Sequence, residues 1–281
     1  MTILVTGGAG RLGYEVLRLC KEEGYRARAF DLPGVPWNHV DALGVEVAKG
    51  DITDKNSVSR ACENVDAVVQ LAALLPPRSE SSRELTMKVN VEGTKRILLA
   101  VGADTPIVFA SSIAVYGVTA GEVPPVKPSH PFNVHDLYSE SKITAEKHVT
   151  GTGNPYTILR IAPVAVADLL ELPDVVPYRA DQRAEFVYVE DAARAIVACL
   201  GSPGNTVHNV AGGESWRMTG GEYIKRFYDA LGVEVEPNFS QEPTAVDWYD
   251  TTSSRSLGYQ RTSFESFEEK LRAVGEAYGL R

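Results

Sequence analysis

The sequence of 281 residues predicts an α/β protein built on a doubly wound parallel sheet. Short apolar runs alternate with stretches of helical period through the first two-thirds of the chain, and a glycine-rich stretch joins the first run to the first helical stretch. A hydrophobic content of 44% is enough for a sizeable core. These features are typical of repeated strand–helix–strand units.

The apolar runs are predicted to form buried strands at Ile3–Val5, Arg26–Phe30, Val45–Lys49, Ala67–Leu71, Ile107–Ala110, Thr157–Ile161 and Thr206–Val210. The stretches of helical period are predicted to form helices at Tyr14–Glu23, Lys55–Ala61, Val91–Val101, Leu137–Val149, Val187–Leu200 and Met218–Leu231.

Three glycines follow the first predicted strand at regular spacing. Gly7, Gly10 and Gly13 permit a tight turn, close approach of a pyrophosphate to the main chain, and close packing of a helix whose N-terminus faces the anion. Asp31 ends the second strand, where a carboxylate can accept hydrogen bonds from the ribose hydroxyls of NAD. The pattern predicts a Rossmann-type dinucleotide site, and the alternative is a glycine-rich turn without a ligand.

The charges around this site favour NAD over NADP. A carboxylate at Asp31 would repel the 2′-phosphate of NADP. Arg11 in the glycine stretch and Arg28 in the second strand keep NADP open as an alternative, although each arginine also fits a solvated surface charge.

Asp51 and Ile52 follow the third predicted strand. They suit an adenine, because an acidic side chain can hold the exocyclic amine and an aliphatic one can cover the ring. The alternative is that Asp51 only caps the helix that begins near Asp54.

Two proline-bearing stretches interrupt the alternation, at 118–136 and 163–184. Long loops inside a compact domain often act as lids or binding loops, and the alternative is surface padding. After Gly212 the alternation is lost. We therefore expect a dinucleotide-binding domain at 1–162, to which 186–211 return, and a smaller, mostly helical C-terminal substrate lobe formed by 163–185 and 212–281.

Tyr138 and Lys142 lie four residues apart in a predicted helix, so their side chains share one face. A phenol has a pKa near ~10, and an ammonium beside it favours the phenolate, which can exchange a proton with an alcohol near neutral pH. The pair alone is a weak motif, and its meaning depends on the residues around it.

The composition favours a small-molecule partner. The net charge of −9 argues against extended contacts with nucleic acid or an anionic membrane surface, since both need clustered Lys and Arg. Cys20, Cys62 and Cys199 are far apart and odd in number, which fits a reducing compartment and gives no metal or disulfide signal. With neither a signal-peptide pattern nor a membrane-spanning apolar run, a cytoplasmic protein is expected.

Several short motifs occur in one order: Thr6–Gly13, Leu71–Ala73, Asn90–Thr94, Ser111–Gly117, Tyr138–Lys142, Phe186–Ala195 and Asp250–Tyr259. In this combination the chain resembles the extended short-chain dehydrogenases/reductases of the NAD-dependent epimerase/dehydratase family, over nearly its whole length. The resemblance implies an NAD-dependent oxidoreductase or epimerase that moves a hydride at a secondary alcohol of a sugar or sugar-nucleotide-like substrate.

The resemblance also implies roles for single residues. Tyr138 would transfer the proton, Lys142 would lower the pKa of Tyr138 and hold the nicotinamide ribose, and Ser112 would orient the substrate oxygen. Together with the glycine and aspartate pattern, it predicts cofactor contacts by Gly7, Gly10, Arg11, Leu12, Gly13, Asp31, Asp51, Ile52, Leu71, Ala72, Ala73, Asn90, Tyr138 and Lys142. Substrate contacts are expected from Ser111, Ser112, Tyr116, Arg160 and Arg183. For Ser111 the alternative is a strand-end hydrogen bond, and for Tyr116 it is packing.

The chain departs from the family in ways that limit the substrate. Ile113 and Ala114 stand where the sugar-nucleotide dehydratases have an acidic pair, so that reaction is not expected. Pro163 stands where the sugar-nucleotide epimerases usually have an asparagine that holds the diphosphate. The equipment for a diphosphate is therefore incomplete, although positive charge is offered by Arg160, Arg179 and Arg183.

Two other functions stay open, a one-way dehydrogenase or reductase of a non-nucleotide substrate and a non-catalytic NAD(P)-binding sensor. The joint presence of Ser112, Tyr138 and Lys142 speaks against a sensor. The resemblance further implies a homodimer formed by helices 91–101 and 137–149, with Ile97 and Val101 in the seam, although a monomer core would use these two residues identically.

Overall fold

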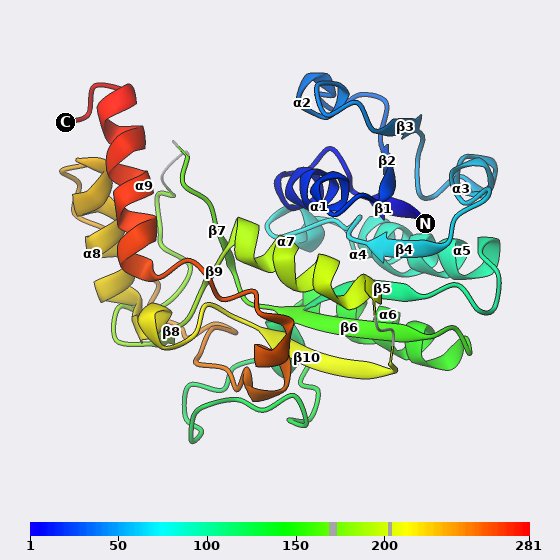
Figure 1. The fold of residues 1–281 in the computed structure, drawn as a ribbon. Coiled ribbons are helices and arrows are strands. Elements are labelled where there is room, and N and C mark those ends of the chain that lie inside the picture. Colours follow the sequence, from blue (N-terminus) through cyan, green and yellow to red (C-terminus); the bar gives the residue numbers. More distant parts are fainter. Residues whose placement is uncertain (169–172, 202–203) are drawn as a thin grey trace.

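The computed structural model describes residues 1–168, 173–201 and 204–281. Its central feature is a seven-stranded sheet in the order β10-β6-β5-β4-β1-β2-β3 (Figure 1). Every neighbouring pair in it is parallel. The strands are β1 (Thr2–Thr6), β2 (Arg26–Asp31), β3 (Glu46–Lys49), β4 (Ala67–Gln70), β5 (Ile107–Ser112), β6 (Tyr156–Ile161) and β10 (Thr206–Val210). The predicted fold class and the predicted strands are confirmed.

The strand order reverses between β1 and β4. The chain first builds outward from β1 to β3, and then crosses to the other side of β1 to add β4, β5, β6 and β10. Ligands of such sheets bind beyond the carboxyl ends of the strands at this switch point. The fold therefore directs attention to the ends of β1 and β4.

Helices cover both faces of the sheet (Figure 1). They are α1 (Arg11–Glu22), α2 (Asn38–Asp41), α3 (Lys55–Ala61), α4 (Arg83–Thr86), α5 (Gly93–Ala100), α6 (Leu137–Gly151), α7 (Val189–Ala198), α8 (Gly220–Leu231) and α9 (Phe264–Ala277). Ile3 and Val5 pack in one core with α1 and α7, whereas Leu4 packs in a second core with α3, α5 and α6. A strand buried on both faces explains why β1 is a continuous apolar run. Within the described residues, none of the helices has the length and apolar character that crossing a bilayer requires.

Two details of α5 differ from the prediction. Residues Met87–Glu92 form a π-helical turn, so regular α-helix begins only at Gly93. Ile97 is fully buried and packs in the core beneath the sheet. The prediction that Ile97 lies in a dimer seam is therefore wrong, because the monomer already uses this side chain.

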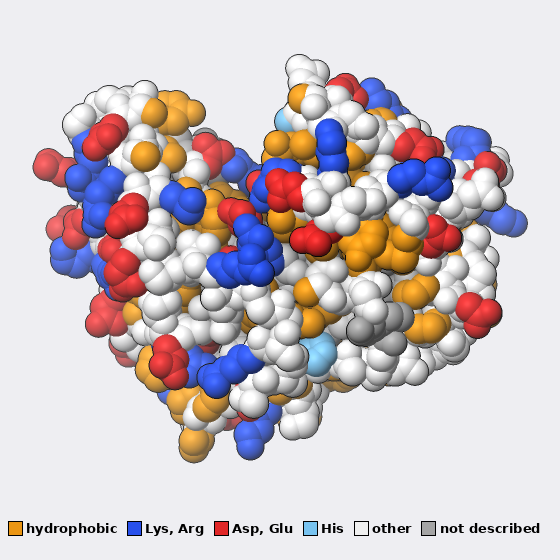
Figure 2. All heavy atoms as spheres, viewed as in Figure 1, with side chains coloured by type: hydrophobic (Ala, Val, Ile, Leu, Met, Phe, Trp, Pro, Cys, Tyr) orange, Lys and Arg blue, Asp and Glu red, His pale blue; other side chains and the backbone are white. Residues whose placement is uncertain are grey.

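A third hydrophobic cluster, separate from the two cores on the sheet, forms the smaller lobe. Helices α8 and α9 pack on each other, with short strands β8 (Arg183–Ala184) and β11 (Met218–Thr219) beside them. Trp216 is completely buried, with ring centroids 5.0 Å from Phe264 and 5.1 Å from Phe267. A notch separates this lobe from the part that carries α1 and α2 (Figure 2).

The lobe is not one continuous C-terminal segment. Tyr249 and Tyr259, which we expected in the lobe at 212–281, pack instead in the main core beside α7. The hydroxyl of Tyr259 donates to the carbonyl of Ala211 at 3.0 Å, directly after β10. Hydrogen bonds to the end of the sheet therefore hold this stretch on the main domain.

The proline-bearing stretch 118–136 is firmly attached, unlike a free lid. Val126 forms a parallel bridge with Tyr249, and its amide donates to the carbonyl of Trp248 at 2.8 Å. Thr119 donates to the buried carboxylate of Asp247 at 2.8 Å. Arg183 also binds Asp247, with its Nε at 2.6 Å from Oδ1. One carboxylate thus joins the stretch to the lobe.

We expect Asp247→Asn to lower the free energy of unfolding by about 2 kcal/mol, since it breaks an ion pair whose acidic member is buried and whose arginine is partly exposed. The control is Asp181→Asn, which breaks the exposed Arg179–Asp181 pair and should leave stability unchanged. Urea midpoints measure both. Equal effects of the two substitutions would contradict the joining role of Asp247.

Candidate functional site

The glycine turn after β1 forms a cradle that side chains would fill. Gly7 has a φ of +69°, and a Cβ there would lie 3.0 Å from the amide nitrogen of Ala72. A Cβ on Gly13 would lie 2.1 Å from the carbonyl oxygen of Gly7. Gly10 is the N-cap of α1 and provides no side-chain cap. The free amides of the first turn of α1 are therefore available to a phosphate, as the pyrophosphate of a dinucleotide requires.

Thr6 joins this turn to the end of β4. Its hydroxyl donates to Oε1 of Gln70 at 2.9 Å and accepts the amides of Leu71 and Ala72, both at 3.1 Å. Two of the predicted cofactor residues thus lie beside Gly7 at the switch point of the sheet. Sequence reasoning did not single out Thr6, although a threonine at the end of a buried strand was a signal.

Asp31 lies where a ribose-binding carboxylate is needed. Its Oδ2 accepts the amide of Ala9 in the glycine turn at 3.1 Å, and its Oδ1 accepts the amide of Leu32 at 2.8 Å. Each oxygen keeps a further lone pair for a hydroxyl. The carboxylate is thus oriented toward the cradle before any ligand binds.

Arg28 lies at the wrong edge of the sheet for a 2′-phosphate. Its guanidinium donates to the carbonyls of Ala61 and Glu63, both at 2.7 Å, and to Glu46 at 2.7 Å. The suggestion that Arg28 supports NADP is therefore wrong. Arg11 remains near the cradle, and there it forms an exposed ion pair of 2.5 Å with Asp168.

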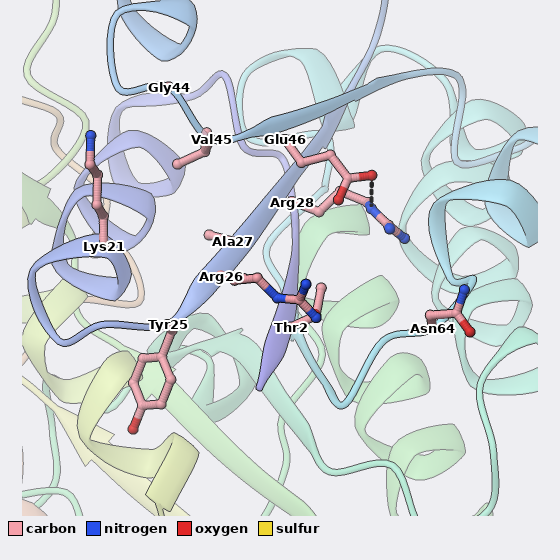
Figure 3. A pocket seen from close by; sticks show the side chains of 10 residues that line it. All are labelled: Thr2, Lys21, Tyr25, Arg26, Ala27, Arg28, Gly44, Val45, Glu46 and Asn64. Atoms are coloured by element: carbon pink, nitrogen blue, oxygen red, sulfur yellow. Dashed lines mark hydrogen bonds and ion pairs between the residues drawn. The ribbon is translucent and has the colours of Figure 1, made fainter.

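Arg28 lines a hollow of about 600 Å³ at the amino ends of β1 to β3 (Figure 3). Lys21, Arg26 and Tyr25 line it as well. Since the glycine turn follows the carboxyl end of β1, this hollow belongs to the opposite edge of the sheet.

Asp51 and Ile52 lie in the turn before α3. Asp51 accepts the amide of Thr53 at 2.7 Å, while Asp54 caps α3 by accepting the amide of Ser57 at 2.7 Å. The alternative that Asp51 caps this helix is therefore wrong. Ile52 is buried, and a Cβ on Gly93 would lie 2.9 Å from its Cγ2.

Asn90 lies in the π-helical turn and joins two parts of the site. Its amide group donates to Oγ of Ser141 on α6 at 2.9 Å and to the carbonyl of Leu74 at 3.0 Å. Its Oδ1 accepts the amide of Leu74 at 2.7 Å. Asn90 thus positions the helix that carries Tyr138.

Two carboxylates hold the start of α6. Asp136 caps the helix by accepting the amide of Ser139 at 2.6 Å. Glu80 accepts the amides of Leu137 at 2.9 Å and Tyr138 at 3.1 Å. Since Glu80 lies far away in sequence, the sequence contains no local signal for this contact.

Tyr138 lies beside Ser112 at the end of β5. Loss of water around the phenol raises the pKa of Tyr138 to about 12, while the hydrogen bond with Ser112 lowers it and the charge of Asp136 raises it. We expected Lys142 to lower the pKa of Tyr138. The pKa of Tyr138 is instead above its ordinary value, because desolvation of the phenol outweighs the hydrogen bond with Ser112.

Lys142 is buried beside the same strand. Its Nζ donates to the carbonyl of Ala110 at 2.8 Å and lies 5.7 Å from the ring centroid of Tyr138. Burial lowers the pKa of Lys142 to about 8, and the charge of Glu146 opposes this shift. The lysine is therefore charged at neutral pH and close to the tyrosine ring.

Three of the expected substrate residues lie in a buried network. Ser111 donates to Glu146, which also binds Arg160 through Nε at 3.0 Å and Nη2 at 2.8 Å. Arg160 donates as well to the hydroxyl of Tyr116 at 3.1 Å, and Tyr116 donates to Oδ1 of Asn209 at 2.5 Å. We therefore leave Ser111, Tyr116 and Arg160 out of the proposed substrate contacts.

Comparisons with known proteins agree with this geometry. Residues 3–167 match the NAD dependent epimerase/dehydratase family. The chain is 32% identical to a 3-beta-hydroxysteroid dehydrogenase of Mycolicibacterium neoaurum over 161 residues, which are 53% of this chain and 42% of that protein. It is 32% identical to a D-erythronate dehydrogenase of Cupriavidus necator over 143 residues, 45% of this chain and 42% of that protein. The chain thus spans less than half the length of these curated relatives.

A UDP-glucose 4-epimerase of Thermotoga maritima has the same fold, with a TM-score of 0.84, 22% identity and coverage of 99% of both chains. The match to the family includes the glycine turn, Asp31 and the Tyr138 helix, and it spans more than half of the chain. The chain belongs to the NAD-dependent epimerase/dehydratase family.

Proposed function

We propose that this protein moves a hydride at a secondary alcohol of a non-nucleotide substrate, with Tyr138 as the acid and base. The convergence of Ser112, Tyr138 and Lys142 between β5 and α6 carries the proposal. The cradle at Gly7 and the carboxylate of Asp31 fit the cofactor at the neighbouring switch point.

NAD, when bound, supplies the centre that accepts or gives the hydride. Tyr138 transfers the proton of the substrate oxygen, and Ser112 hydrogen-bonds and orients that oxygen. With a pKa of about 12, the phenol of Tyr138 is protonated at neutral pH and suits proton donation to a carbonyl. The charge of Lys142 favours the phenolate in the reverse step.

Paired arginines argue against a substrate diphosphate. The three arginines proposed as anion ligands each bind a carboxylate: Arg160 binds Glu146, Arg179 binds Asp181, and Arg183 binds Asp247. A diphosphate would have to displace these carboxylates. This favours the one-way dehydrogenase or reductase, and the two curated relatives described above are dehydrogenases by name.

We expect Tyr138→Phe to lower turnover by about 100-fold or more and to change NAD affinity far less, because it removes the proton-transferring hydroxyl and keeps the ring. Turnover is followed as NADH formation with hydroxy acids and hydroxysteroids. The control is Tyr25→Phe, whose ring lines the hollow at the opposite edge of the sheet. Unchanged turnover of Tyr138→Phe would refute the role of Tyr138.

Nucleotide sugars belong in the same assay. If the protein epimerises a nucleotide sugar without net formation of NADH, it is a sugar-nucleotide epimerase and the proposed function is wrong. NAD binding without turnover of any substrate class would favour the sensor.

We expect Asp31→Asn to weaken NAD binding by about 10- to 100-fold, since a hydrogen bond to a charged acceptor contributes about 1.5–3 kcal/mol. NADP binding should weaken less, because the repulsion of its 2′-phosphate is also removed. Calorimetric titration measures both affinities, with Asp41→Asn on α2 as the control. A parent protein that binds NADP as tightly as NAD would contradict this assignment.

We also propose a cytoplasmic homodimer that pairs α5 and α6 with their copies. Leu99 on α5 is 84% exposed and is the kind of apolar side chain that such a seam covers. Leu99→Glu should therefore convert a dimer into monomers in light scattering. A parent chain that is already monomeric would refute the dimer.

A further inference from the structure

The end of β5 holds α6 through a series of three contacts, whose order along the strand differs from their order along the helix. Ser112 hydrogen-bonds with Tyr138, and the carbonyl of Ala110 accepts Nζ of Lys142 at 2.8 Å. The residue between them, Ser111, donates its hydroxyl to Glu146. Successive strand residues thus hold side chains spaced four residues apart on α6.

Glu146 is the third member of this series and is fixed more firmly than the other two. It forms a two-point ion pair with Arg160 of β6, at 3.0 and 2.8 Å. The side chains of Glu146 and Arg160 are only 3% and 6% exposed. With Ser111 as a further donor, the carboxylate cannot turn away from the strand.

Few charges act on Lys142 in this setting. Its Nζ lies 5.1 Å from the ring centroid of Phe109 on β5 and 5.7 Å from that of Tyr138 on α6. Glu146 is the acidic group that favours its ammonium form.

Several other charged groups on α6 and on the elements packed against it have partners of their own. Arg83 binds Glu140, Glu80 binds the first amides of α6, and Arg160 binds Glu146. Tyr116 lies in the same network as Arg160. Arg96 lies on the neighbouring α5, and its Nη1 is buried without a hydrogen-bond partner.

We propose that Glu146 is a positioning residue that keeps Lys142 charged and aligned with Tyr138, and that Arg160 anchors Glu146. The relevance to the cofactor rests on the proposed function and on the role that the family resemblance implies for Lys142, which is to hold the nicotinamide ribose. The catalytic motif of this chain therefore extends one helical turn beyond Lys142.

The charges around Lys142 determine in which direction its pKa changes when Glu146 is replaced. Lys142 carries its proton below a pKa of about 8. Removal of the Glu146 carboxylate takes away the negative charge that favours the ammonium form, so the pKa of Lys142 falls further. The ammonium should then be lost within the neutral range.

The test is a titration of Lys142 by NMR in protein labelled on lysine side chains, with the signal assigned through Lys142→Met. Glu146→Gln should lower the titration midpoint by about one pH unit or more. Glu140→Gln changes a partly exposed acid on the same helix and should leave the midpoint unchanged. An unchanged midpoint in Glu146→Gln would overturn the proposal.

A double variant separates positioning from stability. Glu146→Gln alone leaves a buried arginine without its partner and unfolds more easily, whereas Glu146→Gln with Arg160→Met removes both charges. The double variant should regain thermal stability and still titrate below the parent. A midpoint that returns to the parent value would show a purely structural role and refute the proposal.

The titration uses neither substrate nor NAD, so its result does not depend on whether the proposed function is correct. NAD affinity of the same variants across pH completes the test, and in Glu146→Gln it should fall at a lower pH than in the parent. If Lys142→Met binds NAD as tightly as the parent, the cofactor role of Lys142 fails while the result on Glu146 stands.

Discussion

The attachment of α6 to the carboxyl ends of β5 and β6 is the constraint on which the site depends. The ion pair of Glu146 with Arg160 joins helix and sheet inside the protein, where loss of either partner would leave a buried charge. The same helix carries Tyr138 and Lys142, and its first turn is held by Glu80 and Asp136. Contacts at the first turn of α6 and at Glu146 therefore fix the direction in which the tyrosine points.

Burial of Tyr138 and Lys142 opposes the charged forms that proton transfer requires. Loss of water raises the pKa of Tyr138 and lowers that of Lys142, so both groups are pushed toward their neutral forms. The hydrogen bond from Ser112 and the charge of Glu146 each oppose one of these shifts. Polar neighbours such as Ser112 and Glu146 are therefore needed to keep Tyr138 and Lys142 able to react.

The periodicity of the sequence was enough to predict the sheet. The strand Ile3–Val5 is short and apolar, and Thr6 links it to the glycine turn, so it can be recognised from local sequence alone. Helix α9 was not predicted, although Ser263 caps it and Phe264, Phe267 and Leu271 have helical spacing. Its buried face meets the separate core of the lobe, outside the strand–helix alternation that guided the prediction.

The sequence by itself determined the glycine turn, Asp31 and the Tyr138 pair, because each depends on spacing within one short segment. Only the tertiary structure decided which charged side chains already have partners within the protein. From the sequence alone, Arg160 and Arg28 were plausible anion ligands. In the folded protein, carboxylates and carbonyls from distant segments hydrogen-bond with both guanidinium groups. Ionic partners are chosen by proximity in space, and a local pattern holds no information about that proximity.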